Sequence, residues 1–284
     1  MKTVVLQAQG LQKKYGQKLV VKGFDLTICE GDFIGLLGPN GAGKTTIIKT
    51  LTGLSKPDGG HITYHGKDFF SHSRSAKKTI GVVPQHNNLD RDLTAYENLY
   101  LHSILQGVPK KLRRGKVEEA LEFAGLSDYR NQQVKTFSGG MKRRLVIVRA
   151  LLHQPKILFM DEPTVGLDPQ IRRSLWDLII KVNQSRKTAI LLTTHYISEA
   201  EKLCSRVKII DAGSIIAEDT PDHLKKDMGK YVLEVFQEDH IDRLFFPTKE
   251  MAYHKMKEIP HEAKIREVTL EDVFIKLTGR TIDA

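Results

Sequence analysis

The chain has 284 residues, of which 40% are hydrophobic and 27% are charged. This is enough sequence for one large or two small globular domains, and it excludes both a small disulfide-stabilised protein and a chain too polar to collapse. The 44 Lys and Arg residues outnumber the 34 Asp and Glu residues, and the formal charge of +10 favours contact with phosphate in nucleotides, nucleic acids or anionic lipids.

Strand-like and helix-like segments alternate along most of the chain, which predicts an α/β fold with a mainly parallel sheet. A buried strand is expected at 32–38, and a helix at 45–54 that ends before the turn-forming residues 55–60. Further strands are predicted at 78–83, 157–160, 188–193 and 207–211. Further helices are predicted at 94–105, 117–124, 140–153, 170–183 and 197–204.

Residues 90–150 differ from their surroundings, because they are mostly helical in pattern and rich in basic residues. Between residues 105 and 150 there are 11 Lys and Arg against 4 Asp and Glu, so +7 of the total charge lies there. We expect a helical insertion into the α/β core, whose charge either meets a partner or is an ordinary solvated face. Beyond residue 220 the pattern breaks into short segments. We therefore expect one domain over 1–220 and a small C-terminal extension over 221–284.

A glycine-rich loop lies between the first predicted strand and helix and matches Gly-x-x-x-x-Gly-Lys-Thr. Its glycines let backbone N–H groups approach an anion, and the helix N-terminus adds partial positive charge. Lys44 can reach the β- and γ-phosphates, and the Thr45 hydroxyl can bind Mg²⁺. The loop and the residue after it comprise Gly38, Pro39, Asn40, Gly41, Ala42, Gly43, Lys44, Thr45 and Thr46. We expect this segment to bind a nucleotide.

A second motif is an apolar strand that ends in two carboxylates. Residues 157–160 are followed by Asp161 and Glu162, so the strand places both acids at its carboxyl end, where α/β sites form. Asp161 suits coordination of Mg²⁺ through water, and Glu162 suits polarisation of a water that attacks the γ-phosphate. Alone, the pair is typical of any strand that ends in a charged loop. The glycine-rich loop makes the functional interpretation the stronger one.

A third motif, Phe-Ser-Gly-Gly-Met at residues 137–141, precedes a predicted helix with several basic residues. Ser138 can simply cap this helix. With Gly139 and Gly140 it can also present a hydroxyl and backbone N–H groups to a second phosphate group. If the two phosphate-binding surfaces face apart, one nucleotide can join two chains.

Together these motifs resemble the ATP-binding cassette (ABC) transporter ATPase subunits, over at least residues 3–220. Residues 38–46 resemble the Walker A motif of this family, 157–162 its Walker B motif and 137–141 its signature motif, where Phe137 and Met141 replace the usual Leu and Gln. The order and spacing along the chain also agree. Single residues match as well: Tyr15 the aromatic that stacks on adenine, Gln85 the Q-loop, Asp168 the D-loop and His195 the switch histidine.

The resemblance implies a P-loop NTPase core with an antiparallel β portion, a helical insertion and a head-to-tail dimer of identical or paralogous ATPase subunits. ATP and Mg²⁺ would lie between the Walker motifs of one chain and Ser138, Gly139 and Gly140 of the other. The implied roles are general base for Glu162, γ-phosphate and water contact for His195, Mg²⁺ and water contact for Gln85, and connection of the two sites for Asp168.

Transport by this chain would require separate integral membrane permease subunits. No segment has the roughly 20 apolar residues of a spanning helix, and the apolar run at residues 1–7 is too short for a signal peptide. Cys29 and Cys204 are expected to be free thiols of an intracellular protein. We therefore expect a peripheral subunit at the cytoplasmic face of the cell membrane.

The end of the chain favours export over import. Residues 268–279 resemble the end of daunorubicin-resistance and nodulation-type ATPase subunits, and Met141 also occurs in exporter branches. The same segment predicts an amphipathic helix, because four apolar residues share one helical face. These residues are Leu270, Val273, Phe274 and Leu277.

The main alternative is a non-transport ABC ATPase that acts on DNA or ribosomes, which the basic charge permits. Against it, the chain has one cassette, no long coiled-coil insertion and no Cys-x-x-Cys zinc site, so we expect no nucleic acid partner. Another P-loop enzyme would leave residues 137–141 unexplained, and a nucleotide-dependent scaffold would not need Glu162 and His195. The transported substrate is not predicted, because ATPase subunits contact the permease rather than the cargo.

Overall fold

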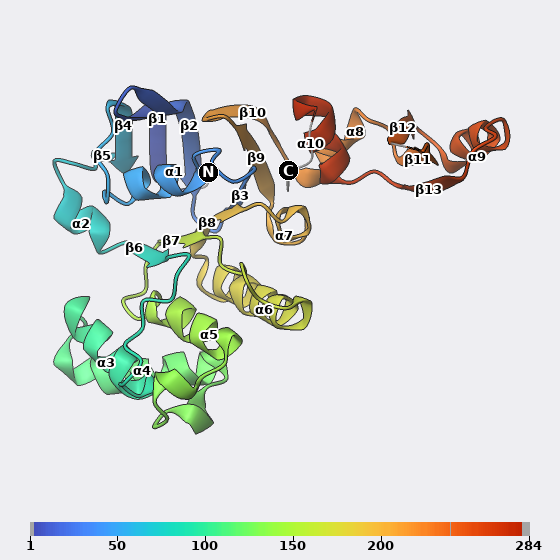
Figure 1. Cartoon of the computed structure of the whole chain (residues 1–284). Coiled ribbons are helices and arrows are strands. Elements are labelled where there is room, and N and C mark those ends of the chain that lie inside the picture. Colours follow the sequence, from blue (N-terminus) through green and yellow to red (C-terminus); the bar gives the residue numbers. More distant parts are fainter. Residues whose placement is uncertain (1–2, 239, 280–284) are drawn as a thin grey trace.

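The computed structural model describes residues 3–238 and 240–279, and its centre is a six-stranded sheet (Figure 1). The strand order is β10-β9-β3-β8-β7-β6. The strands are β3 (Phe33–Leu37), β6 (Ile80–Val83), β7 (Ile157–Asp161), β8 (Ala189–Thr194), β9 (Arg206–Asp211) and β10 (Ser214–Asp219). All neighbouring pairs are parallel except β10 and β9. Every residue of β3, β7 and β8 is buried, as expected for a sheet covered on both faces, and the predicted α/β fold class is confirmed.

A four-stranded antiparallel sheet covers one face of the central sheet, in the order β2-β1-β4-β5. Its strands are β1 (Val4–Tyr15), β2 (Lys18–Cys29), β4 (Gly59–Tyr64) and β5 (Lys67–Asp68). Helix α1 (Lys44–Leu51) precedes β4 in the chain, and helix α2 (Ser73–Lys77) follows β5. One hydrophobic cluster joins Phe24 of the antiparallel sheet, Ile47 of α1 and Phe159 of β7. The first two strands were not predicted from the periodicity, because bulges interrupt the register between them and break the strict alternation of buried residues.

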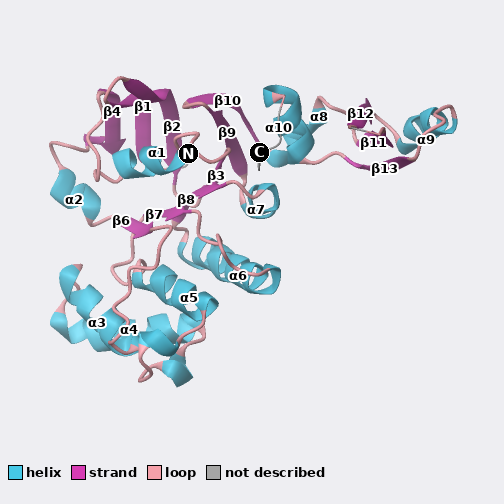
Figure 2. Cartoon of the chain, in the orientation of Figure 1, coloured by secondary structure: helices cyan, strands magenta, loops and turns pink. Residues whose placement is uncertain are grey.

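Three helices form a separate helical region with its own hydrophobic cluster (Figure 2). They are α3 (Ala95–Leu105), α4 (Lys110–Ala124) and α5 (Gly139–Arg149), with short 3-10 turns at Ser127–Tyr129 and Val134–Thr136. The predicted helix at 117–124 was too short, because the first turns of α4 are mostly exposed and carry no apolar stripe. The predicted helix at 140–153 was too long, because α5 ends at Arg149.

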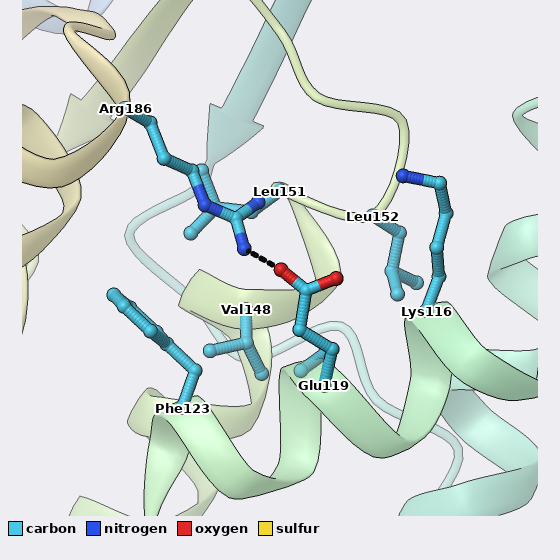
Figure 3. Close-up of a pocket in the computed structure, with 8 residues that line it drawn as sticks. Lys116, Glu119, Phe123, Val148, Leu151, Leu152 and Arg186 are labelled. Carbon is cyan, nitrogen blue, oxygen red and sulfur yellow. Dashed lines mark hydrogen bonds and ion pairs between the residues drawn. The ribbon is translucent and has the colours of Figure 1, made fainter.

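The helical region joins the core through charged side chains of α4, α5 and α6 (Pro169–Arg186). Arg186 and Glu119 form an ion pair at 2.5 Å beside a cavity of about 10 Å³ lined largely by apolar side chains, too small for a ligand (Figure 3). Arg144 donates to the Ala124 carbonyl at 2.9 Å and to the Ser174 hydroxyl at 2.7 Å. Much of the basic charge on α5 is therefore structural rather than a solvated face.

The chain ends in a third, antiparallel sheet with the order β12-β11-β13. The elements after the central sheet are α7 (Ile197–Leu203), which precedes β9, then α8 (Pro221–Lys226), β11 (Tyr231–Phe236), β12 (Ile241–Phe246), α9 (Lys249–Lys257), β13 (Ala263–Glu267) and α10 (Leu270–Thr278). The predicted amphipathic helix is confirmed as α10, although only three of the four apolar residues predicted to share one face are buried and Leu277 is 46% exposed. Phe274 joins the same hydrophobic cluster as Met160 of β7, so the core continues past residue 220.

Two further expectations concern thiols and membrane spans. Cys29 and Cys204 are free, as predicted, and burial raises the pKa of the Cys204 thiol well above its usual range. Within residues 3–238 and 240–279, no helix has both the length and the hydropathy needed to cross a bilayer.

Candidate nucleotide-binding site

The order of the central sheet brings four distant segments to one edge. Strands β3, β8, β7 and β6 are parallel neighbours, so their carboxyl ends meet. Gly38 follows β3, Asp161 ends β7, His195 follows β8 and Gln85 lies two residues after β6. This edge is where α/β sheets form ligand sites.

The glycine-rich loop turns sharply from β3 into α1. Gly43 has φ of 104°, a left-handed conformation that favours glycine, and it caps α1 without a side-chain hydrogen bond. A β-carbon at Gly38 would lie 2.3 Å from the Ile210 carbonyl oxygen, so the close approach to β9 also requires glycine. The first turn of α1 has no acidic residue, so its partial positive charge is available to an anion.

A cavity of about 300 Å³ lies in front of this loop. It brings together half of the residues that the sequence singled out, from the end of β1, the glycine-rich loop and the segments after β6 and β7. Tyr15, at the end of β1, is 51% exposed at its rim. The lining residues are Tyr15, Val20, Asn40, Gly41, Gly43, Lys44, Thr45, Thr46, Gln85 and Glu162.

Lys44 provides a buried cation at the floor of the cavity. Its Nζ donates hydrogen bonds to the carbonyl oxygens of Gly38 and Pro39, at 2.8 and 3.0 Å, and lies 3.2 Å from Oε1 of Glu162. Burial lowers the pKa of Lys44, while the carboxylates of Glu162 and Asp161 act in the opposite direction. The ammonium group is thus held by neutral carbonyls and a single contacting carboxylate.

Glu162 is the point at which the separate motifs meet. Its Oε2 accepts a hydrogen bond from Gln85 Nε2 at 3.2 Å, and its Oε1 lies 3.3 Å from His195 Nδ1 as well as close to Lys44. Its backbone has φ of 45°, which is uncommon for a residue other than glycine. Its N–H donates to both the carbonyl and the hydroxyl of Thr193, each at 3.1 Å.

Asp161 and Thr45 offer oxygen atoms suited to Mg²⁺. Oδ1 of Asp161 accepts hydrogen bonds from the Thr45 hydroxyl at 3.1 Å and from the Thr193 hydroxyl at 2.7 Å. Within the parts of the chain that the structure covers, no group of three or more His, Cys, Asp or Glu side chains could hold a metal ion. A hydroxyl and one carboxylate suit Mg²⁺, which takes most of its ligands from water and phosphate.

The signature motif and Asp168 lie at helix N-termini and are not among the residues that line the cavity. Ser138 caps α5, where its Oγ accepts a hydrogen bond from the Met141 N–H at 3.2 Å, so the predicted capping role is confirmed. Asp168 caps α6 in the same way, through the Ile171 N–H at 2.9 Å. Ser138 and Gly139 are exposed, and Gly140 is buried against Ile171. Within one chain, these residues therefore do not complete the cavity.

Two residues at this site were not predicted to act there. Thr193 was predicted only as part of a strand, yet its hydroxyl joins Asp161 to the backbone of Glu162. Arg143 was one of several basic residues on a helix, yet it is 3% exposed behind the site. The two threonines at the strand end before His195 could have suggested a role for Thr193. No local signal in the sequence marks Arg143.

Comparison with known proteins identifies the family. Residues 21–165 match the ABC transporter family. The Nod factor export ATP-binding protein I of Burkholderia orbicola (strain AU 1054) is 40% identical to the chain, with 99% of both proteins covered. The protein of the same name from Rhizobium sp. (strain N33) is 38% identical, with all of both chains covered.

Solved structures agree. The fold is similar to cbiO1 from Clostridium perfringens, part of the ABC transporter complex cbiONQ, with a TM-score of 0.73 and 26% identity over 78% of this chain and 91% of that one. It is also similar to the dimeric post-hydrolysis state of the ATP-binding cassette MJ0796 bound to ADP and phosphate, with a TM-score of 0.66 and 28% identity over 76% of this chain and 98% of that one. The chain therefore belongs to the ABC transporter family, as an ATPase that carries the ATP-binding domain of that family.

Proposed function

We propose that this chain binds and hydrolyses ATP with Mg²⁺ as the ATPase subunit of an exporter, at the cytoplasmic face of a membrane that holds separate permease subunits. The observation that supports it most directly is the convergence of Lys44, Gln85 and His195 on the Glu162 carboxylate, beside a glycine-rich loop and a cavity. These are the groups needed to hold a triphosphate and to take a proton from a water molecule.

The contacts of Lys44 indicate how binding prepares the site. A triphosphate in the cavity carries more negative charge than the single carboxylate of Glu162, so it draws the ammonium group towards its β- and γ-oxygens. Glu162 then loses its counter-charge and becomes a stronger base for the attacking water. His195 approaches the same carboxylate oxygen as Lys44, and from there it would hold that water and the γ-phosphate.

Thr45 and Asp161 would hold Mg²⁺, with Gln85 close enough to Glu162 to contact the ion or its water. The ion would neutralise charge on the phosphates. Tyr15 at the cavity rim would stack on the base of the nucleotide, since it is the aromatic ring among the lining residues.

A second ATPase subunit, identical or paralogous, would complete the site. Ser138, Gly139 and Asp168 lie outside the cavity of their own chain but present two helix N-termini to a partner. ATP between the glycine-rich loop of one subunit and the signature motif of the other would hold the dimer together, and hydrolysis would release it. The dimeric state of the MJ0796 cassette supports this arrangement.

Export is supported by the relatives that are named for export and match the whole chain, including its C-terminal end. We further propose that residues 1–220 form the ATPase domain, with the helical insertion at about 90–150, and that residues 221–284 form an extension. The third sheet lies entirely within the described part of this extension.

A dimerisation experiment tests the site. The Glu162→Gln chain should be dimeric by light scattering with Mg-ATP and monomeric with Mg-ADP, and the matched double variant with Lys44→Ala should stay monomeric with either nucleotide. A monomer with Mg-ATP, even with its permease present, would contradict the proposal.

Isolation of the chain with its partners tests the transport role. An affinity-tagged chain should be recovered from detergent-solubilised membranes together with an integral membrane protein, which mass spectrometry then identifies. Recovery only with ribosomes or DNA would favour the alternative of a non-transport ABC ATPase.

A further inference from the structure

The guanidinium group of Arg143 is buried behind the nucleotide site, at a point where three segments meet. It comes from α5, the helix that begins with the signature motif, and 3% of the residue is exposed. Its Nη1 donates to the Pro84 carbonyl at 2.5 Å and to the Gln85 carbonyl at 3.3 Å, and its Nε donates to the Pro163 carbonyl. The two remaining contacts, from Nη2, reach the carbonyl oxygens of Asp161 and Glu162, both at 3.4 Å.

All of these partners are backbone oxygens. Burial lowers the pKa of Arg143 to about 10, while Glu199 and Asp161 act in the opposite direction, so the group stays charged at neutral pH. The N–H groups of this buried cation therefore donate to five backbone carbonyls and fix the positions of backbone segments, not of one side chain. The planar guanidinium can span two loops at once, which a lysine ammonium cannot do.

The backbone that Arg143 holds is the strained part of the site. Glu162 has φ of 45°, a left-handed conformation that a residue other than glycine keeps only where its surroundings hold it in place. Arg143 contacts the carbonyls before, at and after this residue, while Thr193 accepts the Glu162 N–H from the opposite side. The left-handed turn is therefore clamped on both its donor and acceptor groups.

We propose that Arg143 is a positioning residue that fixes the backbone of Glu162 and of Gln85 to helix α5. The inference rests on the proposed function, in which Glu162 is the base. It couples the helix that presents Ser138 to a partner subunit with the two loops that act on the nucleotide of its own subunit. A shift of α5 is thus transmitted to the proposed base through backbone hydrogen bonds rather than through the nucleotide.

The test compares Arg143→Lys and Arg143→Met with Arg144→Met, the matched control one residue along α5. Arg144 bonds to Ala124 and Ser174, away from the cavity, so its loss should lower stability but leave kcat within about twofold. Both Arg143 variants should lose about 10²-fold in kcat, the size expected for a misplaced catalytic group, with the Kd for Mg-ATP changed by less than about threefold. Rates are normalised to nucleotide sites titrated with a fluorescent ATP analogue.

Amide hydrogen exchange in Arg143→Lys provides a second readout, and it remains usable if Arg143→Met fails to fold. Backbone amides at 161–165 should exchange faster than in the unsubstituted chain, while those of β3 stay unchanged. The inference is overturned if Arg143→Lys keeps kcat within threefold of the unsubstituted chain, or if its kcat falls no further than that of Arg144→Met. It is also overturned if the fall in kcat is matched by an equal loss of affinity for Mg-ATP. An unsubstituted chain without ATPase activity would instead contradict the proposed function itself.

Discussion

Two groups of buried or partly buried charges in this molecule differ in how they are compensated. In the nucleotide site, Lys44 has one carboxylate partner and faces a cavity of about 300 Å³. The second group, here called the C-terminal charge cluster, consists of Glu234, Arg243, Arg266 and Asp272. There Arg266 binds both oxygens of Asp272, at 2.6 and 2.8 Å, and also binds Glu234 at 2.8 Å.

The C-terminal charge cluster is neutral in itself, because it pairs two cations with two anions. Arg243 completes it, at 3.6 Å from Glu234 and 3.7 Å from Asp272. The cluster joins β11, β12, β13 and α10, and each of its cations faces both of its anions. Burial of charge therefore does not identify a functional site by itself. What distinguishes the nucleotide site is that Lys44 faces a cavity, so a ligand bound there can replace Glu162 as the partner of its charge.

The largest expected effect is on turnover. Glu162→Gln should lower the rate of phosphate release by about 10²–10⁴-fold, because the amide cannot accept a proton from the attacking water. Folding should be unaffected, since the amide oxygen and nitrogen can keep most contacts at this position. A steady-state ATPase assay measures the rate, and an ordinary rate would show that Glu162 is not the base.

The next effect is on stability, in the C-terminal charge cluster. Asp272→Ala should lower the free energy of unfolding of this part by about 3 kcal/mol, because it leaves Arg266 and Arg243 with one carboxylate and removes the acceptor of the Thr269 N–H. Urea unfolding followed by circular dichroism measures this loss. The control is Asp222→Ala, whose side chain is 96% exposed and whose loss should cost less than about 0.5 kcal/mol. The ATPase rate per folded molecule should be unchanged. A large fall in this rate would contradict a purely structural role for the C-terminal charge cluster.

Removal of the buried cation should weaken nucleotide binding. Lys44→Ala deletes a charged donor worth about 1.5–3 kcal/mol, so the Kd for ATP should rise by about 10- to 100-fold. Isothermal titration calorimetry measures the affinity. Unaltered affinity and rate would count against Lys44 as a phosphate-binding group.

Acid should act on the C-terminal charge cluster in a defined direction. Burial raises the pKa of Asp272, but the hydrogen bonds from Arg266 and from Thr269 outweigh it and hold the pKa below its usual value. The stabilisation is therefore complete above the unfolded-state pKa of about 3.9 and is lost as the pH falls through the lower folded-state pKa. The stability difference between the unsubstituted chain and Asp272→Asn should be constant from pH 7 to pH 5 and narrow below pH 4. A difference that grows in acid would contradict this assignment.

The smallest effect is expected at the ion pair shown in Figure 3, which belongs to neither group. Glu119→Gln removes the charge opposite Arg186, whose side chain is partly exposed, and should cost less than about 1 kcal/mol. Raising the salt concentration should reduce even this loss. Thermal unfolding at low and high salt measures both, and a cost above 2 kcal/mol would indicate that the helical region depends on this contact.

Much of the central fold could be predicted, because its strands are continuous apolar runs between glycine and polar turns. Other elements could not. Bulges broke the alternation in β1 and β2, and the exposed first turns of α4 carry no apolar stripe. In the site, Lys44 and Glu162 were predicted because each lies in a local motif. Arg143 was not, because its partners are backbone carbonyls that any residue can supply.

The sequence by itself determined the local shapes: a glycine-rich loop after a buried strand, a helix that follows this loop, and a second buried strand that runs up to Asp161. These depend on a few adjacent residues and their backbone preferences. Only the tertiary structure decided that Lys44, Gln85 and His195 meet at one carboxylate, and that the C-terminal charges neutralise one another. The reason is that these contacts join residues far apart in the chain, so they exist only once the order of the strands is set.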